Sequence, residues 1–467
     1  MKRFLTMLAT VLMLCTALCV SASASDFDDV ATELSAIGMF RGTGTSFELD
    51  RAPTRAEAAI MLTRLYGAEE AATADYAGGK IAHPFTDVPD FAAPHIAWLY
   101  TEGLTKGMSA DQFGSTAACS AQSYATFLLR ALGYQDGEDF EYADALAFAQ
   151  EKGFYSPLMF GGEFLRDDLA ALTYQALAAD TKDGKTYLLA QLIKDGAVDR
   201  DAAAPMTEKM ELYRELGASD GVVKNDCLDV DVLMSLDMTM TAEGETITSQ
   251  TYASGNVQAI VDGTDVEMAY VLSTISDGTM MDMGVWMKDG WVYQYVSDGA
   301  LTQTIKYAVE DELAMLEELG VAEVTGVDVS ALAAIKSITR ETDGTDTVYT
   351  TVIAEGMGGI MENVMNLAAG QSLEGIGSDM TANIGEVSIY YMLDRKGSLK
   401  ELGMQMPYYM MMNIADEDGT VIPVEASCDT RIAMTVNAIG DDVKIEYPDL
   451  SAFVEVVPTE GTTLPAA

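Results

Sequence analysis

Histidine is scarce in this chain of 467 residues, and its scarcity excludes several kinds of chemistry. The only two histidines are His83 and His95, so none lies beyond residue 206 to serve a Ser-His-Asp triad, a Cys-His pair or a histidine zinc site. Neither histidine has a cluster of further ligands beside it in the sequence, and we expect packing or surface roles for both. The sequence therefore predicts a protein that is not an enzyme and uses no metal and no cofactor.

Basic residues are also few. Lysine and arginine number 27 against 73 aspartates and glutamates, which gives a formal net charge of −46. A field of this sign repels nucleic acid and anionic membrane surfaces. An anionic partner must therefore be held by a few placed cations. Carboxylate clusters are so common here that none of them indicates a catalytic or calcium site.

Cysteine is too rare for a disulfide framework. Two of the five cysteines lie in the apolar N-terminal stretch, which leaves Cys119, Cys227 and Cys428. These three are far apart and form no Cys-x-x-Cys pair, so a zinc site is not expected. At most one bridge is available, between Cys227 and Cys428, and the simpler interpretation is three small core residues.

The N-terminus has the pattern of a cleavable export signal. Lys2 and Arg3 precede the apolar residues 4–20 and the small residues 21–25, and we expect cleavage after Ala24. A retained membrane anchor is the alternative, but the apolar stretch is shorter than the roughly 20 residues that a bilayer requires. Removing residues 1–24 changes the net charge from −46 to −48, because Lys2 and Arg3 are lost. We expect no stable membrane insertion after cleavage.

One unit occurs three times between residues 26 and 180, at 26–67, 85–134 and 140–179. Each copy is predicted to contain a helix, a glycine-marked loop and a second helix with one apolar face. A single copy cannot bury that face, so the three should pack as one helical bundle. The first copy carries the fullest set of motifs, Phe27-Asp28-Asp29-Val30, Gly38-Met39-Phe40-Arg41-Gly42 and Thr54-Arg55-Ala56-Glu57.

The start of the second helix differs among the copies. Thr54 and Glu57 have the spacing of a capping box, which predicts a helix beginning at Thr54. The second copy, which keeps Phe85-Thr86-Asp87-Val88 and the loop from Gly103 to Gly107, has Cys119-Ser120-Ala121-Gln122 at this point and lacks the cation. The third copy has Leu165-Arg166-Asp167-Asp168, in which leucine replaces the capping threonine.

These motifs resemble the S-layer homology family, whose signature joins an F-x-D-V opening, a G-x-x-x-G loop and a T-R-A-E helix start. The resemblance covers about 155 residues. It implies a three-repeat bundle that binds an anionic secondary cell-wall polysaccharide, for example one bearing pyruvate ketals, at the cell wall or cell surface. By similarity the glycan-binding residues are Arg55 and Arg166, whose guanidinium groups suit carboxylates. Thr54, Glu57, Gly42 and Gly107 would be helix-capping or structural residues.

The C-terminal half has a different period. Beyond a linker predicted at 181–205, apolar and polar residues alternate through much of 206–457, as from Val232 to Met240. Lys288-Asp289-Gly290 and residues 394–398 are predicted hairpin turns. Helices are predicted at 309–319, 330–335 and 360–368, so this domain should be a curved antiparallel sheet with helices on one face. Residues 458–467 are predicted to be a flexible tail.

The C-terminal arrangement resembles LolA-like and related lipoprotein folds, in which a curved sheet can enclose an apolar cavity. The abundant methionines suit an adaptable pocket for a hydrophobic ligand, and they suit an ordinary core equally well. The chain is therefore predicted to be multidomain, α followed by α+β, and to be tethered non-covalently to the wall while displaying a C-terminal binding domain. The alternative is a wall-associated glycan hydrolase that depends on carboxylates.

Overall fold

The computed structural model describes residues 27–42, 44, 46–157, 159–160, 163–219, 227–242, 244–262, 265–309, 329–353, 381–415 and 421–456. They form a helical unit, Ser23–Glu215 with Asp328–Lys336, and a sheet unit from Leu216–Val327 and Ser337–Ala467. The predicted signal, the predicted tail and nearly all of the predicted helices at 309–319 and 360–368 lie outside the described residues. Among the helices that are described, none is both long enough and apolar enough to cross a membrane.

The helical unit contains the predicted helix pairs. Its elements are α2 (Asp28–Ala36), α3 (Arg55–Leu65), α4 (Glu69–Ala77), α5 (Ala93–Thr101), α6 (Ala121–Ala131), η1 (Tyr142–Asp144), α7 (Ala145–Glu151), α8 (Arg166–Ala178), α9 (Leu188–Lys194), α10 (Ala204–Gly217) and η2 (Val329–Ala334). The second helices of the three copies are α3, α6 and α8. Helix α8 is buried along almost its whole length and contacts α2, α6, α9 and η2, so it is the centre of this unit.

Each first helix stops at a glycine. Gly38, Gly103 and Gly153 follow α2, α5 and α7 with φ angles of 78°, 72° and 79°. These values lie in the left-handed region, which costs a residue with a Cβ about 1–2 kcal/mol. The glycine-marked loop predicted for each copy therefore begins at an equivalent backbone position.

The predicted linker, 181–205, is instead part of the helical unit. Leu188, Leu189 and Leu192 of α9 are buried, and Leu188 N–H donates to the carbonyl of Ala179 at 3.0 Å. The helix predicted to open the C-terminal domain is α10, which belongs almost entirely to the same unit. The boundary was predicted too early because charged residues around α9 hide its apolar face.

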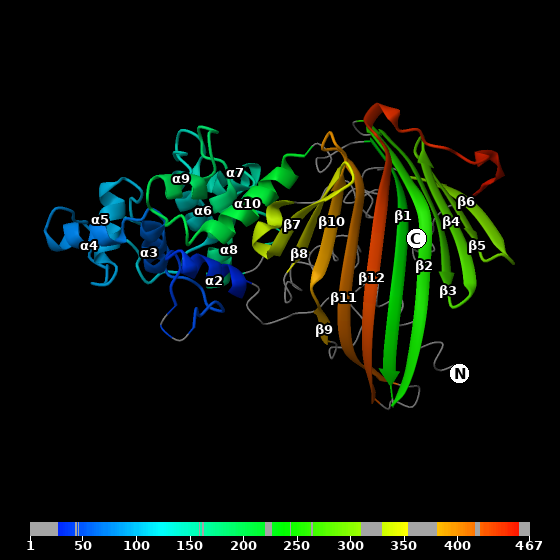
Figure 1. Cartoon of the computed structure of the whole chain (residues 1–467), viewed down its shortest axis with the longest axis horizontal. Helices are drawn as coiled ribbons and strands as arrows, with labels where there is room; N and C mark the ends of the chain where they lie inside the picture. Colours follow the sequence, from blue (N-terminus) through cyan, green and yellow to red (C-terminus); the bar gives the residue numbers. More distant parts are fainter. Residues whose placement is uncertain are drawn as a thin grey trace. The chain divides into compact units, whose positions relative to one another are not determined.

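The sheet unit is one long, curved sheet (Figure 1). Its thirteen strands in the described residues are β1 (Cys227–Ala242), β2 (Glu245–Asp262), β3 (Asp265–Ser276), β4 (Thr279–Lys288), β5 (Trp291–Ser297), β6 (Thr302–Ala308), β7 (Ile335–Asp343), β8 (Asp346–Ile353), β9 (Thr381–Ile384), β10 (Val387–Leu393), β11 (Leu399–Ala415), β12 (Val421–Ile439) and β13 (Val454–Glu455). Their order is β13-β6-β5-β4-β3-β2-β1-β12-β11-β10-β8-β7, and β9 pairs with β11. The strand pairs with a defined register are antiparallel, except that β13 runs parallel to β6.

Strand β1 confirms the predicted alternation. Val230, Met238 and Met240 are 3%, 3% and 1% exposed, whereas Leu233 on the opposite face is 59% exposed. The two predicted hairpins are also present, as β4–β5 and β10–β11. In the first, Asp289 and Gly290 have φ angles of 52° and 76°, the left-handed pair that a two-residue hairpin turn requires.

The structure excludes one alternative and corrects one further prediction. Cys428 lies opposite Met238, eleven residues along β1 from Cys227, so about 36 Å separates the two cysteines and no bridge can join them. The helix predicted at 330–335 is η2, but it packs in the helical unit rather than on a face of the sheet. Leu332 is completely buried there because α8 supplies an apolar surface for it.

Candidate functional site

Arg55 starts helix α3 and reaches from the first copy to a loop of the second. Thr54 Oγ1 accepts from Glu57 N–H at 3.2 Å, and Glu57 Oε2 accepts from Thr54 N–H at 2.8 Å, so the predicted capping box is present. Arg55 Nε donates to the carbonyl of Phe113 at 3.1 Å, and its guanidinium carbon lies 5.1 Å from the centroid of the Phe113 ring. No described residue accepts a hydrogen bond from either terminal nitrogen of this half-buried arginine.

The loop beneath Arg55 is held by Asp87, from the Phe85-Thr86-Asp87-Val88 motif. Its carboxylate accepts from the N–H groups of Phe113, Gly114 and Ser115 at 2.7, 2.6 and 3.2 Å. Burial would raise the pKa of Asp87, but these hydrogen bonds lower it below its usual value. The loop carbonyl that fixes Arg55 is thus itself fixed by an ionised side chain.

Gly114 lets two side chains lie against this loop. A Cβ on Gly114 would lie 2.2 Å from Met108 Sδ and 3.5 Å from Arg55 Cδ. Met108 is 66% exposed. Other residues therefore occupy Nε and one face of the Arg55 guanidinium, an exposed apolar side chain lies beside it, and its terminal nitrogens have no acceptor within the described part of the chain.

Arg166 has the equivalent position in the third copy and a different environment. Its Nε donates to the carbonyl of Phe47 at 3.0 Å, its Nη1 to Glu57 Oε1 at 3.0 Å and its Nη2 to the carbonyl of Arg41 at 3.4 Å. The residue is 5% exposed. Every nitrogen has an acceptor within the chain, so the predicted glycan contact by Arg166 is not available, because buried internal acceptors take the place of a ligand.

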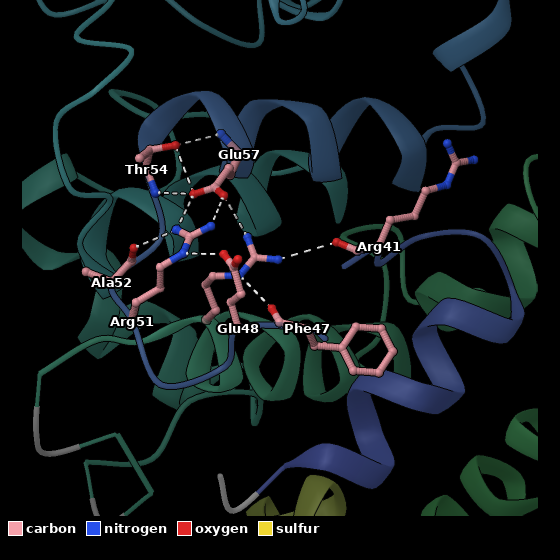
Figure 2. Close-up of polar contacts among 8 residues, drawn as sticks. Arg41, Phe47, Glu48, Arg51, Ala52, Thr54 and Glu57 are labelled. Atoms are coloured by element: carbon pink, nitrogen blue, oxygen red, sulfur yellow. Dashed lines mark hydrogen bonds and ion pairs between the residues drawn. The ribbon is translucent and has the colours of Figure 1, made fainter. Parts of the chain in front are cut away.

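Glu57 is the shared acceptor of this region (Figure 2). Besides Arg166, its carboxylate accepts from Arg51 at 2.6 and 3.0 Å and from Thr54 N–H at 2.8 Å. Burial opposes ionisation, but the hydrogen bonds from Arg51 and Thr54 and the charge of Arg166 lower the pKa of Glu57 to about 2. The sequence predicted the capping role of Glu57 and missed both arginine contacts.

Arg55 and Arg166 make equivalent contacts with the loop of another copy. Arg55 N–H donates to the carbonyl of Ala117, and Arg166 N–H donates to the carbonyl of Arg51, both at 2.9 Å. The second helix of the third copy therefore begins against a loop of the first copy, and the second helix of the first copy begins against a loop of the second copy. Arg55 and Arg166 each donate through Nε to a carbonyl seven residues before an N-cap, those of Phe113 and Phe47.

The second copy has no arginine at this position. Helix α6 starts one residue later than predicted, with Ser120 as N-cap: Ser120 Oγ accepts from Ser123 N–H at 3.2 Å. Ala121 therefore stands where Arg55 stands in the first copy, and the cation is absent there. The seven-residue spacing from Phe113 to Ser120, equal to that from Phe47 to Thr54, is the signal that would have given this alignment.

The helix start of the third copy keeps half of a capping box. Leu165 supplies no side-chain acceptor, as predicted, but the Asp168 carboxylate accepts from Leu165 N–H at 2.7 Å. The two glycines predicted to be structural have no room for a side chain. A Cβ on Gly42 would lie 2.2 Å from the carbonyl oxygen of Ser46, and one on Gly107 would lie 2.3 Å from the ring of Phe85.

The histidines pack against neighbouring side chains. His83 stacks between Tyr76 and Phe85 at centroid distances of 6.3 and 5.8 Å, and His95 is 6% exposed in α5. Burial lowers the pKa of both imidazoles. Within the part of the chain that the structure describes, no group of three or more His, Cys, Asp or Glu side chains is placed to hold a metal ion.

No profile of a known protein family matches the sequence. The chain is similar to a protein named "Cell surface protein" from Thermoanaerobacter kivui, with 28% identity over 235 residues. The match covers 46% of this chain and 30% of that protein, so the chain spans under a third of its relative. The name of this relative supports a surface location.

The solved structures that the chain matches include three with low sequence identity and low TM-scores. The ywiB protein from Bacillus subtilis shares 8% identity over 45% of this chain and 94% of its own, with a TM-score of 0.14. A DUF1329 family protein from Desulfovibrio piger shares 12% sequence identity, and the match covers 52% of this chain and 95% of that protein, with a TM-score of 0.14. An outer membrane lipoprotein-sorting protein domain from Vibrio parahaemolyticus shares 11% sequence identity, and the match covers 51% of this chain and 94% of that domain, with a TM-score of 0.13. Scores this low do not establish a shared fold.

Proposed function

We propose that this chain is a non-catalytic surface protein whose helical unit binds an anionic cell-wall polysaccharide through Arg55. One observation carries the proposal: Arg55 is fixed through Nε and one face, while no described residue occupies its terminal nitrogens. The repeat motifs that resemble the S-layer homology family and the similarity to a cell surface protein support it.

The position of Arg55 suits a carboxylate ligand. Two parallel N–H groups of one guanidinium can donate to both oxygens of a carboxylate, and such charge-assisted bonds are about twice as strong as neutral ones. A pyruvate ketal presents that carboxylate on a sugar ring. Because Nε and the Phe113 ring already hold the guanidinium, little side-chain entropy would be lost on binding.

Only one of the three junctions offers such a group. Ala121 supplies no cation at the second helix start, and Arg166 is enclosed at the third. The proposal therefore places one high-affinity contact at the junction of the first and second copies.

Replacing Arg55 by alanine should weaken binding to wall that carries its anionic polymer by about tenfold, which corresponds to about 1.4 kcal/mol. Arg55→Lys should not restore binding, because an ammonium cannot make the two parallel bonds. The affinity of the mature chain would be measured on purified wall before and after removal of the polymer. Arg200→Ala, which removes the same charge at an exposed position of the helical unit, is the control. Equal binding to stripped wall, or an Arg55→Ala variant that binds like the control, contradicts the proposal.

For the sheet unit we propose binding of a single-chain lipid or similar hydrophobe on one face of the sheet. The observation in favour is that the strand registers place many methionine side chains on one face of the sheet, the face that carries Met238 and Met240. Among the side chains that the structure describes, the other methionines of that face are Met234 in β1, Met268 in β3, Met404 and Met406 in β11, Met434 in β12, and Met281, Met283 and Met287 in β4. Met281 is 49% exposed and Met234 half-buried, and thioethers adapt to apolar ligands of varied shape.

Met234→Glu should therefore weaken binding of a fluorescent fatty acid to the mature chain at least fivefold, because it puts a charge on the apolar face. Leu233→Glu puts the same charge on the opposite face of the same strand, where Leu233 is 59% exposed, and should leave binding unchanged. Native mass spectrometry of the purified chain would detect co-purified lipid. A wild-type chain that neither carries lipid nor binds the probe would show that this face is an ordinary core.

A further inference from the structure

A cation cluster that the proposed site does not use lies at the other end of α3. Arg41 donates from Nη1 to Glu69 Oε1 at 3.3 Å and lies 2.9 Å from Oε2, and Arg64 Nε donates to Oε1 at 3.1 Å. Two arginines thus share one carboxylate. Arg41 is 55% exposed at its side chain and Arg64 18%, and no described residue accepts from the terminal nitrogens of Arg64.

The second copy contains the same arrangement. Arg130 donates from Nε and Nη2 to Asp136 Oδ1 at 3.1 and 3.0 Å and from Nη1 to the carbonyl of Leu104 at 2.6 Å, so every one of its nitrogens has an acceptor within the chain. Lys106 Nζ lies 3.5 Å from Asp136 Oδ2. Burial opposes ionisation of Asp136, but the charges of Arg130 and Lys106 lower its pKa below the usual value. Again two cations face one carboxylate, and the outer cation, Lys106, is 77% exposed at its side chain.

The two clusters occupy equivalent positions of the repeat. The outer cation stands three residues after the glycine that ends the first helix, and the inner cation ten residues after the N-cap of the second helix. The corresponding pairs are Arg41 and Arg64 in the first copy, Lys106 and Arg130 in the second, and Ser156 and Gln175 in the third. The third copy is neutral at both positions, so the repeat does not require a charge there in every copy.

A second observation marks the first cluster. His95 of α5 is 6% exposed, and its Nδ1 is buried with no hydrogen-bond partner among the described residues. Helix α5 contacts α3 and α4, the helices that carry Arg64 and Glu69, so His95 belongs to the helix packed beside this cluster. A buried polar atom without a partner costs about 1–3 kcal/mol, so a further group that reached Nδ1 of His95 would be stabilising there.

We infer that Arg41 and Lys106, the exposed outer cations of the two clusters, are accessory binding sites for carboxylate groups of the same acidic polysaccharide that Arg55 engages. The inference rests on the proposed function and extends it. Each cluster has a net charge of +1 in a chain of net charge −46, and each exposes its outer cation. A repeating acidic polymer would then contact the helical unit at several points, and linked contacts multiply affinity.

The contributions of Arg55 and of the clusters can be separated by ligand size. A methyl glycoside with one pyruvate ketal presents a single carboxylate, whereas a polysaccharide with pyruvate ketals and uronic acids presents many. Arg41→Ser with Lys106→Ser introduces the residue that the third copy already has at this position. The double variant should bind the polysaccharide about fivefold more weakly, which corresponds to about 1 kcal/mol, and bind the monosaccharide as the wild type does.

The control removes the same charge elsewhere in the helical unit. Lys80 and Lys185 are 71% and 80% exposed and each pairs with one aspartate, so Lys80→Ser with Lys185→Ser is matched in charge and exposure. Isothermal titration of the mature chain with both ligands gives the affinities. Equal loss in both double variants, or no loss in either, overturns the inference. Wild-type binding to the monosaccharide that does not depend on Arg55 overturns the proposed function instead.

Discussion

Replacing Glu57 by alanine is expected to lower the free energy of unfolding of the helical unit by about 3 kcal/mol. Glu57 accepts hydrogen bonds from Arg51, from Thr54 N–H and from Arg166. Arg166 is 5% exposed, so removing Glu57 leaves a buried cation without the carboxylate to which it is hydrogen-bonded. Loss of a buried partner costs more than the pair contributes, because the remaining charge is still desolvated.

The effect of Glu57 should depend on pH. Its pKa is about 2 in the folded chain against a usual value of 4.5. A carboxyl group whose pKa is lowered by folding stabilises the protein above the unfolded pKa, and this contribution is lost as the pH falls towards the folded pKa. The wild type should therefore exceed Glu57→Ala in stability by the full amount at pH 7, and the difference should shrink between about pH 4.5 and about pH 2.

Thermal unfolding of the purified chain at pH 7 and pH 3 would measure this difference. For a unit of this size, about 3 kcal/mol corresponds to a decrease of roughly 6–12 °C in the Tm of the helical transition. Glu70→Ala, at an exposed position in the first turn of α4, is the control and should change the Tm by less than about 2 °C. A Glu57→Ala variant as stable as this control at pH 7 would show that Arg166 finds another acceptor.

Local signals in the sequence predicted much of the helical unit. A glycine that stops a helix and a Thr-x-x-Glu box that starts one act within a few residues, so Gly38 and Thr54 could be interpreted without any knowledge of their surroundings. The alternation in β1 and the Asp289-Gly290 turn are local in the same sense. These are the parts of the fold in which sequence and structure agree.

Local signals could not predict whether a motif arginine is enclosed by internal acceptors or keeps its terminal nitrogens without an acceptor among the described residues. Arg55 and Arg166 occupy equivalent positions, and what separates them is the loop of the next copy and the acid that lies beside it. Arg166 meets Glu57 across 109 positions of sequence, whereas no described acid pairs with Arg55. Arg51, which completes the Glu57 cluster, belongs to no motif, so only the structure could assign it.

Lys209 should have an effect of similar size on the same unit. It is 9% exposed in α10, and its Nζ donates to Glu33 Oε1 at 3.0 Å and to the carbonyl of Ile335 at 2.8 Å. Tyr174, which is completely buried, donates its hydroxyl to the other oxygen of Glu33 at 2.5 Å. Burial lowers the pKa of Lys209, and the charge of Glu33 opposes that shift. The side chain of Lys209 is 10% exposed and that of Glu33 is 32% exposed, so the lysine end of the ion pair is the one shielded from water.

Lys209→Met keeps the length of the side chain and removes its charge, so Glu33 and the Ile335 carbonyl both lose their donor. We expect a loss of about 3 kcal/mol in the free energy of unfolding, with Lys194→Met, an exposed position in α9, as the control. Glu33→Gln in the Lys209→Met background should restore part of the loss, because it removes the unpaired carboxylate.

The Lys209 variant also has a local consequence that global unfolding does not report. Asp328–Lys336 belongs to the helical unit although it follows Glu215 by more than a hundred residues. Its polar attachments include the bond from Lys209 to the Ile335 carbonyl and one from Ala333 N–H to Gln175 Oε1 at 3.3 Å. Amide hydrogen exchange at 332–335 should therefore accelerate at least tenfold in Lys209→Met and stay unchanged in Lys194→Met. If exchange there is unaffected, burial of Leu332 alone holds the segment, and the ion pair stabilises only the helices around it.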